Sequence, residues 1–344
     1  MKNYVYISVI NITTLLLTWI LLHIFFSLSF NDLIKIDDAP IYLEYAQTLN
    51  ATHYFLGFPL YIRLFYSIVG DYLLASILCI LVFSTLSTIT FYMVINLYTN
   101  KPLALSLLFI FFPFFLFVNL YPMSDSSFLF FLFLSFYFLK KGKYEFTSLF
   151  LGIGCFIRLL GVLFTLGYLL MLYFWKEFNV RRMLLIFFSS TMFILLQLLI
   201  NQLQTGDFFI YFKKHSREIG SLVDFLFNLH QYDLLPSVVH IVIPYVIYGL
   251  GIIVLWKNKH ETLTLYLVHY LLLPLLSDNM AIGRYFLPLF PFFLIFDETF
   301  YSIKIQNYLK YLTTYRSQFI LIYCVFCFAL TLYYIELLFA LGIY

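Results

Sequence analysis

The sequence predicts an all-α protein that crosses a membrane many times, and three observations support this fold class. Apolar residues make up 63% of the 344 residues and charged residues only 11%, whereas an ordinary soluble domain has roughly 45–50% and about 25%. Aromatic residues reach 22%. Apolar runs of about 20 residues, the length that spans the hydrocarbon core as a helix, recur along the chain. The few charged residues cannot form the polar surface of a water-soluble globule.

About eleven apolar segments are predicted to be membrane helices, within a range of about nine to twelve. The first, from Tyr4 to Phe30, is too long for a signal-peptide core and has no small-residue cleavage site, so we expect it to be retained. The remaining ten membrane segments are predicted at 72–98, 103–120, 126–139, 146–158, 162–175, 183–203, 237–256, 262–276, 287–303 and 317–342. We expect all eleven segments to belong to one domain over residues 1–344.

The basic residues predict the orientation, because Lys and Arg collect in cytoplasmic loops. With a cytoplasmic N-terminus, all but seven of the 20 basic residues fall in inner segments, and most acidic residues fall outside. We therefore expect the polar chemistry on the outer or luminal face, at the plasma membrane of a prokaryote or in the endoplasmic reticulum of a eukaryote. The seven outer basic residues are Lys35, Arg63, Arg158, Lys213, Lys214, Arg217 and Arg284.

Composition also argues against several classes of protein. The net charge of +3 is too small and too evenly spread to indicate a nucleic-acid partner. The four cysteines all lie in apolar runs, which disfavours a disulfide framework and a zinc site. The chain also has no glycine-rich nucleotide loop. We therefore predict no metal, no cofactor and no nucleic acid.

Two predicted outer loops, 31–71 and 204–236, are longer than the others, and the first holds the densest polar cluster. Pro40 favours the first turn of a helix that starts after Asp37 and Asp38. On that helix Asp38, Tyr42 and Tyr45 share one face. A carboxylate beside aromatic rings at the membrane surface suits a general base that acts on a hydroxyl. The alternative is a helix-terminal carboxylate with interfacial tyrosines.

Three further segments carry polar residues on the same predicted face. Asp125 lies in a tight turn, where it either serves chemistry or caps the next helix. Arg158 interrupts an apolar run, where a charge costs several kcal/mol unless it is paired or hydrated. Arg284, at the mouth of a helix, suits bidentate binding of a phosphate or contact with lipid head groups. The basic cluster Lys213, Lys214 and Arg217 either binds a lipid phosphate or forms a solvated turn.

Taken in order, these segments resemble the GT-C membrane glycosyltransferases, and within them the PIG-V-like mannosyltransferases and their prokaryotic relatives. The Asp-Ala-x-x-Tyr-Leu stretch from Asp38, followed by Phe-Pro-Leu-Tyr from Phe58, resembles the start of that family. The later motifs that resemble it are Tyr-Pro-Met-Ser-Asp at 121–125, Arg-Leu-Leu-Gly at 158–161, Gly-Asp-Phe at 206–208 and Arg-Tyr-Phe-Leu-Pro at 284–288.

The motifs also depart from the family pattern at three positions. Asp37 stands where the family usually has Trp, Asp125 where it has Glu, and Phe208 where it has Pro. The adjacent pair Asp37 and Asp38 also resembles the acidic loop of the protein O-mannosyltransferase and aminoarabinose-transferase branches. The superfamily is therefore better supported than the branch or the sugar.

The resemblance implies a GT-C-like fold and an inverting, metal-independent transfer of a hexose, with mannose favoured, from a polyprenyl- or dolichyl-phosphate sugar. The acceptor would be a lipid-linked sugar, glycan or glycolipid, and the enzyme could work with an accessory membrane subunit. The alternative is a transporter or translocator of lipid-linked sugars without transferase activity. The implied roles are general base for Asp38 with Asp37 in reserve, binding of the donor phosphate for Arg158, Arg284, Lys213, Lys214 and Arg217, and substrate lining for Tyr42, Tyr45, Asp125 and Tyr285.

Overall fold

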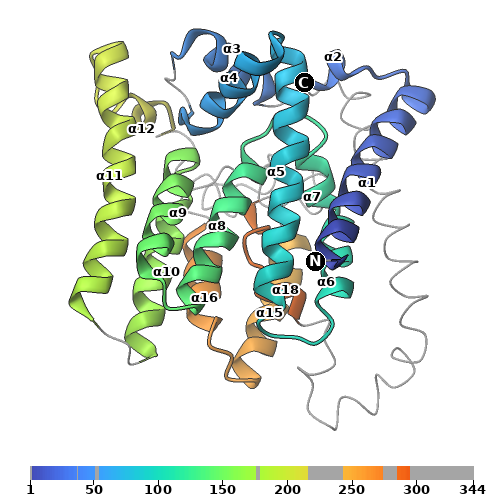
Figure 1. The fold of residues 1–344 in the computed structure, drawn as a ribbon. Helices are drawn as coiled ribbons and strands as arrows, with labels where there is room; N and C mark the ends of the chain where they lie inside the picture. Colours follow the sequence, from blue (N-terminus) through green and yellow to red (C-terminus); the bar gives the residue numbers. More distant parts are fainter. Residues whose placement is uncertain are drawn as a thin grey trace, which may run out of the picture. The chain divides into compact units, whose positions relative to one another are not determined.

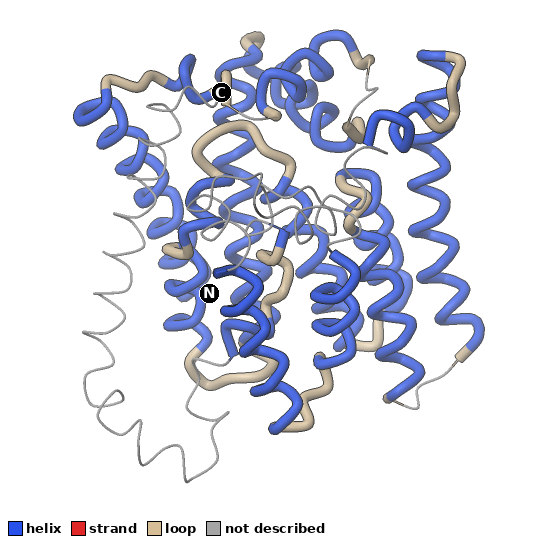
Figure 2. Tube along the Cα trace, turned by 180° about the vertical axis from the view of Figure 1, so that it is seen from behind, coloured by secondary structure: helices blue, strands red, loops and turns tan. Residues whose placement is uncertain are grey.

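The computed structural model describes residues 2–36, 38–50, 54–175, 179–215, 243–273 and 285–294. Within these ranges all regular secondary structure is helical and no strand is present, which confirms the all-α prediction for this part of the chain (Figure 2). Among the described residues, three helices are long and apolar enough to cross a membrane (Figure 1). They are α1 (Lys2–Phe26), α5 (Tyr72–Ile95) and α11 (Val180–Thr205).

The other predicted spans form shorter helices where they are described. The longest of them, α8, has 16 residues, which corresponds to about 24 Å and falls short of a core about 30 Å thick. The count of eleven spans stays a prediction, and the segment 317–342 lies outside the described residues. The shorter helices are α8 (Asp125–Lys140), α9 (Tyr144–Ile157), α10 (Gly161–Phe174), α15 (Ile243–Lys257) and α16 (Leu263–Leu272).

Proline breaks two segments that hydropathy predicts to be continuous. The predicted span 103–120 is two helices, α6 (Pro102–Ile110) and α7 (Pro113–Val118). Phe112 has an extended backbone, with φ −67° and ψ 127°, because a residue before proline is disfavoured in the helical region. The predicted span 287–303 likewise begins as a turn at 286–290, and a short α18 (Pro291–Leu294) follows it.

Both long predicted loops contain helices. The first forms α2 (Phe30–Leu33), α3 (Ala39–Thr48) and α4 (Gly57–Val69), and the second forms α12 (Ile210–His215) in its described part. Helix α4 is amphipathic. Its Phe58 and Ile62 are buried, whereas one stripe of it is exposed, consisting of Leu60, Leu64 and Ile68.

The described chain forms two compact units, residues 2–50 with 58–130 and residues 54–57 with 131–294. In the first unit α1 and α5 pack antiparallel, because Asn3 donates a hydrogen bond to Tyr92 at 2.9 Å and Asn11 donates one to Ser84 at 3.1 Å. Hydrogen bonds of this kind between apolar helices stabilise their association in a membrane. The prediction of one domain stays a prediction.

In the second unit α9 and α11 run parallel. Ser189 on α11 donates a hydrogen bond to the Ser148 carbonyl on α9 at 2.7 Å. One turn further along, a Cβ on Gly152 would lie 2.5 Å from the Phe193 ring. The two helices therefore approach closely only because residue 152 has no side chain. Helix α10 packs against α9, α11 and α16.

Candidate functional site

Asp38 lies immediately before α3, where the sequence predicts the general base. Pro40 is within the first two residues of the helix, and the backbone N–H of Tyr42 donates to the Asp38 carbonyl at 3.1 Å to close the first turn. The Asp38 side chain is only 7% exposed and makes no capping hydrogen bond to the helix. Helix capping therefore does not account for this buried carboxylate.

Tyr42 connects α3 to the turn before α8. Its hydroxyl oxygen lies 2.9 Å from the Ser124 hydroxyl oxygen in a buried hydrogen bond. Its ring meets the edge of the Phe58 ring, with 5.2 Å between centroids. Because Ser124 directly precedes Asp125, this contact joins three motifs that the sequence singled out separately. Tyr45, one helical turn further along α3, is also buried.

Asp125 is the first residue of α8 and is only 4% exposed. A carboxylate is favourable at the N-terminus of a helix because of the helix dipole. The neighbouring side chains are nevertheless unusually polar for a buried turn, since Ser124, Ser126 and Ser127 are all buried as well. Buried polar groups are costly unless hydrogen bonds satisfy them, and here the hydroxyl groups are paired: Ser124 with Tyr42, Ser126 with Asn119, and Ser127 with the Ser124 carbonyl at 2.9 Å.

Two residues that the sequence did not single out hold this turn in place. Asn119 accepts a hydrogen bond from Ser126 and donates one to the Phe115 carbonyl at 2.6 Å. The Trp19 ring nitrogen on α1 donates to the Leu120 carbonyl at 2.9 Å. A lone Asn in an apolar run is a visible signal in the sequence, but its partners are not.

Arg158 lies at the end of α9 in the second unit. Its backbone is extended, with φ −145° and ψ 135°, and its N–H donates to the Gly154 carbonyl at 2.9 Å. The guanidinium carbon lies 5.0 Å from the centroid of the Tyr285 ring. The structure thus brings together Arg158, which the sequence predicted to bind the donor phosphate, and Tyr285, which it predicted to line the substrate site.

Gly57 permits a close approach of the chain beside Arg158. A Cβ at residue 57 would lie 2.6 Å from the carbonyl oxygen of Phe156 and 3.0 Å from the Cα of Ile157. The segment 54–57 is also fixed to α11, because the Leu56 N–H donates to Gln197 at 2.8 Å. The backbone that precedes Arg158 is therefore covered by protein on this side.

His269 on α16 fixes the Tyr285 backbone. Its Nε2 lies 2.8 Å from the Tyr285 carbonyl oxygen, and since a carbonyl only accepts, Nε2 carries the proton and donates. The ring is fully buried and lies 5.0 Å from the Phe164 ring. His269 is therefore a packing residue that also holds the residue against which Arg158 stacks.

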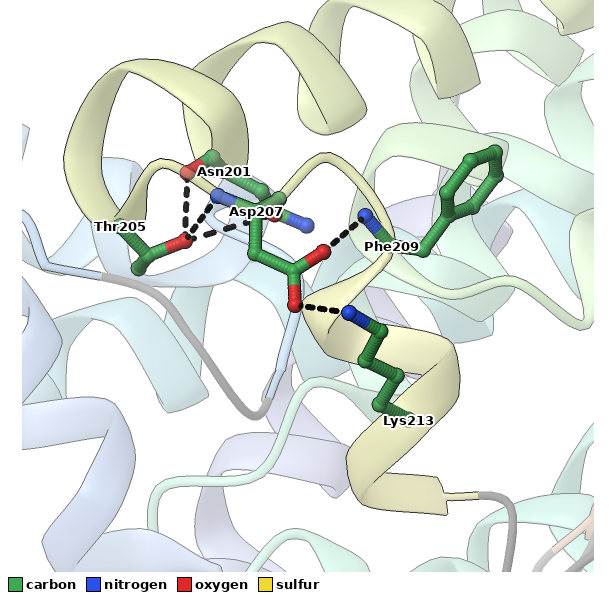
Figure 3. A network of polar contacts seen from close by, with 5 residues as sticks. All are labelled: Asn201, Thr205, Asp207, Phe209 and Lys213. Carbon is green, nitrogen blue, oxygen red and sulfur yellow. Dashed lines mark hydrogen bonds and ion pairs between the residues drawn. The ribbon is translucent and has the colours of Figure 1, made fainter.

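The second long loop contains a network of polar contacts around Asp207 (Figure 3). Lys213 pairs with Asp207 at 2.6 Å, and the Phe209 N–H donates to the same carboxylate at 3.0 Å. The hydrogen bond from Lys213 lowers the pKa of Asp207 below its ordinary value. Thr205 donates to the Asn201 carbonyl at 2.8 Å. An anion that binds Lys213 would have to compete with this carboxylate.

Several predicted site residues are not described. Asp37, Arg217 and Arg284 lie outside the described residues, and the side chain of Lys214 is not described. The described ones divide between the units, with Asp38, Tyr42, Tyr45 and Asp125 in the first and Arg158, Lys213 and Tyr285 in the second. In the described ranges no group of three or more His, Cys, Asp or Glu could hold a metal.

No protein-family model, curated protein or solved structure matches the chain. The first unit offers two buried carboxylates, Asp38 and Asp125, and a hydrogen bond between the Tyr42 and Ser124 hydroxyl groups. The second offers a guanidinium held over an aromatic ring.

Proposed function

We propose that this chain is a membrane glycosyltransferase that uses a polyprenyl-phosphate sugar. It would transfer a hexose, with mannose favoured, to a hydroxyl of a lipid-linked, glycan or glycolipid acceptor at the outer or luminal face. The observation that carries the proposal is the burial of Asp38 and Asp125 beside the Tyr42–Ser124 hydrogen bond. Ionisable residues are rare and mainly functional in apolar helical proteins, and charged residues make up only 11% of this chain.

In the proposed reaction Asp38 acts as the general base. Its carboxylate takes the proton of the acceptor hydroxyl while that oxygen attacks the anomeric carbon of the donor. The bond between the anomeric carbon and the phosphate oxygen breaks, and polyprenyl phosphate leaves with the electron pair. Attack opposite the leaving group inverts the anomeric configuration. The proton on Asp38 then passes to water.

Arg158 would bind the phosphate that leaves. The planar guanidinium offers paired N–H groups that match two phosphate oxygens, and stacking on an aromatic ring fixes the orientation of that plane. The Tyr285 ring supplies this support at 5.0 Å, and Arg284, its neighbour in sequence, would add a second cation. Fixed cations that stabilise developing negative charge are often the largest catalytic contribution.

A lipid donor also accounts for features that a nucleotide donor would not. The sequence contains no glycine-rich loop for a diphosphate, whereas a prenyl tail dissolves in the bilayer beside the apolar helices. The runner-up is a translocator of lipid-linked sugars, which shares the donor but makes no new glycosidic bond. The two proposals therefore differ in the product, and a single assay separates them.

The test uses the purified full-length chain with radiolabelled polyprenyl-phosphate mannose and a glycolipid acceptor. Asp38→Asn should lose about 100-fold or more of the transferase rate, the usual effect of removing a general base. Asp32→Asn is the matched control, because Asp32 lies in the same loop, where it caps α2 through Ser29 and pairs with the exposed Lys35 at 3.4 Å. Full activity of both Asp37→Asn and Asp38→Asn would contradict the base. Movement of donor across proteoliposomes without transfer of label would favour the translocator.

A further inference from the structure

Four basic residues gather at one end of the second unit. Because α9 and α11 run parallel, both helices begin at this end. Lys141 and Lys143 precede α9, and Arg181 and Arg182 lie in the first turn of α11. Glu145 is the only acidic residue in the segments 141–145 and 179–184. We call these four residues the basic end.

Arg182 is held in a fixed position there. Its guanidinium carbon lies 4.4 Å from the centroid of the Tyr144 ring, and one of its nitrogens donates to the Tyr144 hydroxyl at 3.3 Å. Tyr144 is buried, so its ring is a rigid support. A guanidinium ordered in this way loses little side-chain entropy when it binds the planar pair of oxygens of a phosphate.

The local electrostatics favour an anion at this end. The N-terminus of a helix already carries partial positive charge, yet the first turn of α11 contains two arginines and no acidic residue. The Asn179 side chain caps the N-terminus of α11 by accepting from the Arg182 N–H at 3.3 Å. Cations in this position repel the helix dipole, and a bound anion reverses that unfavourable interaction.

An apolar stripe on α11 continues from Arg181. The spacings i, i+3, i+7, i+11 and i+14 place five residues of α11 on one face, and fourteen residues of helix extend about 21 Å. One leaflet of hydrocarbon is about 15 Å thick, so the stripe is long enough to face it. Below Arg181 the stripe consists of Leu184, Phe188, Met192 and Leu195, which are 46%, 61%, 69% and 46% exposed.

We propose that the basic end binds the phosphate of an anionic phospholipid, whose acyl chains lie along the apolar stripe of α11. The positive residues and the stripe match the two parts of such a lipid in kind and in order. A zwitterionic lipid carries its own cation beside the phosphate, so the basic end should prefer the anionic one. The proposal does not depend on the transferase activity.

The test is native mass spectrometry of the full-length chain in detergent, with phosphatidylglycerol and phosphatidylcholine of identical acyl chains. We expect tighter binding of phosphatidylglycerol. The double variant Arg181→Gln/Arg182→Gln should weaken it about 30-fold, from about 1 kcal/mol for each cation near a lipid surface, and leave phosphatidylcholine unchanged. Lys35→Gln is the control, because it removes an exposed cation from the first unit. Arg182→Lys should give a smaller loss, because it keeps the charge but not the planar fork.

A further variant, Phe188→Ser, tests the apolar stripe. We expect it to weaken the binding of both lipids to a similar degree. Circular dichroism and gel filtration of each variant show whether it is folded. Equal binding of the two lipids by the natural chain would overturn the proposal, and so would an unchanged preference in the double variant. Inorganic phosphate that binds as tightly as phosphatidylglycerol would also overturn it, because the stripe would then contribute nothing. A dimer that covers the stripe and persists with excess phosphatidylglycerol would do the same.

Discussion

The acidic site of the first unit and the arginine site of the second both hold charged side chains in an apolar protein, but they stabilise those charges in different ways. Asp38 and Asp125 are both buried. Tyr42 and Ser124, which lie between these two residues in the sequence, are joined by a hydrogen bond between their hydroxyl groups. Arg158 instead lies over the Tyr285 ring, whose backbone is fixed by His269. A carboxylate in apolar surroundings needs hydrogen-bond donors, whereas a guanidinium is also stabilised by an aromatic face.

This difference has a consequence for mutation. A site built from hydrogen bonds depends on individual polar atoms, so the loss of a single hydroxyl group, as in Tyr→Phe, should measurably lower the free energy of unfolding. A site built on a stacked cation depends on the shape and charge of one side chain and on whatever holds its aromatic partner. This contrast can be tested at Arg158, at His269 and at the contact between Tyr42 and Ser124, in decreasing order of expected effect.

The largest effect is expected at Arg158. Arg158→Gln should lower the transferase rate about 100-fold, because it removes a fixed cation from the leaving phosphate. Arg158→Lys should recover only part of the rate, since lysine keeps the charge but not the planar fork. Steady-state kinetics with the labelled donor measures both. Arg63→Gln is the control, because Arg63 donates to the Ala46 and Gln47 carbonyls and is not part of the proposed site. Equal rates for the Gln and Lys variants would contradict the role of the positive charge, and a full rate in Arg158→Lys would show that the planar fork is not needed.

A smaller effect is expected at His269. His269→Asn should destabilise the fold by about 1–3 kcal/mol, because a buried carbonyl at Tyr285 loses its donor. His269→Gln should be nearly neutral, since the glutamine side-chain nitrogen reaches about as far as Nε2. Thermal unfolding in detergent measures the stability, and the KM for the donor reports on Arg158. If the two variants behave alike in both measurements, the hydrogen bond to Tyr285 has no role in positioning.

The smallest effect is expected at the contact between Tyr42 and Ser124 in the first unit. A double-mutant cycle of Tyr42→Phe and Ser124→Ala should give a coupling energy of about 1 kcal/mol, the usual net contribution of one hydrogen bond. Unfolding of the single and double variants in detergent provides the four free energies. Additive effects would mean that the contact between α3 and the turn before α8 does not stabilise the protein.

Local features of both sites could be predicted from the sequence. Pro40 predicted the start of α3, and the helical spacing placed Asp38 and Tyr42 on one turn. Unbroken apolar runs predicted α1, α5 and α11. These features depend on neighbours within a few residues, which a helical period specifies.

The partners across the fold could not be predicted. Tyr42 and Ser124 are 82 residues apart, and His269 bonds a carbonyl, which every residue has. Such contacts depend on how helices pack, and the sequence pattern states only which face is apolar. The break at Pro113 was visible in the sequence, but the hydropathy of 103–120 is uniform and concealed it.

The interruption between α6 and α7 constrains how the chain enters a bilayer. Backbone groups that leave the helical ladder cannot face lipid tails without a large penalty, so protein must surround them. Phe109 stacks on Phe91 of α5 at 4.2 Å, and Ile110 packs with Ile7 of α1 and Tyr92 of α5. Both of these helices precede the interrupted segment in the chain and are therefore synthesised first. The helices that cover the non-helical backbone between α6 and α7 are thus synthesised before that backbone enters the membrane. A circular permutant that begins at α6 should therefore insert poorly.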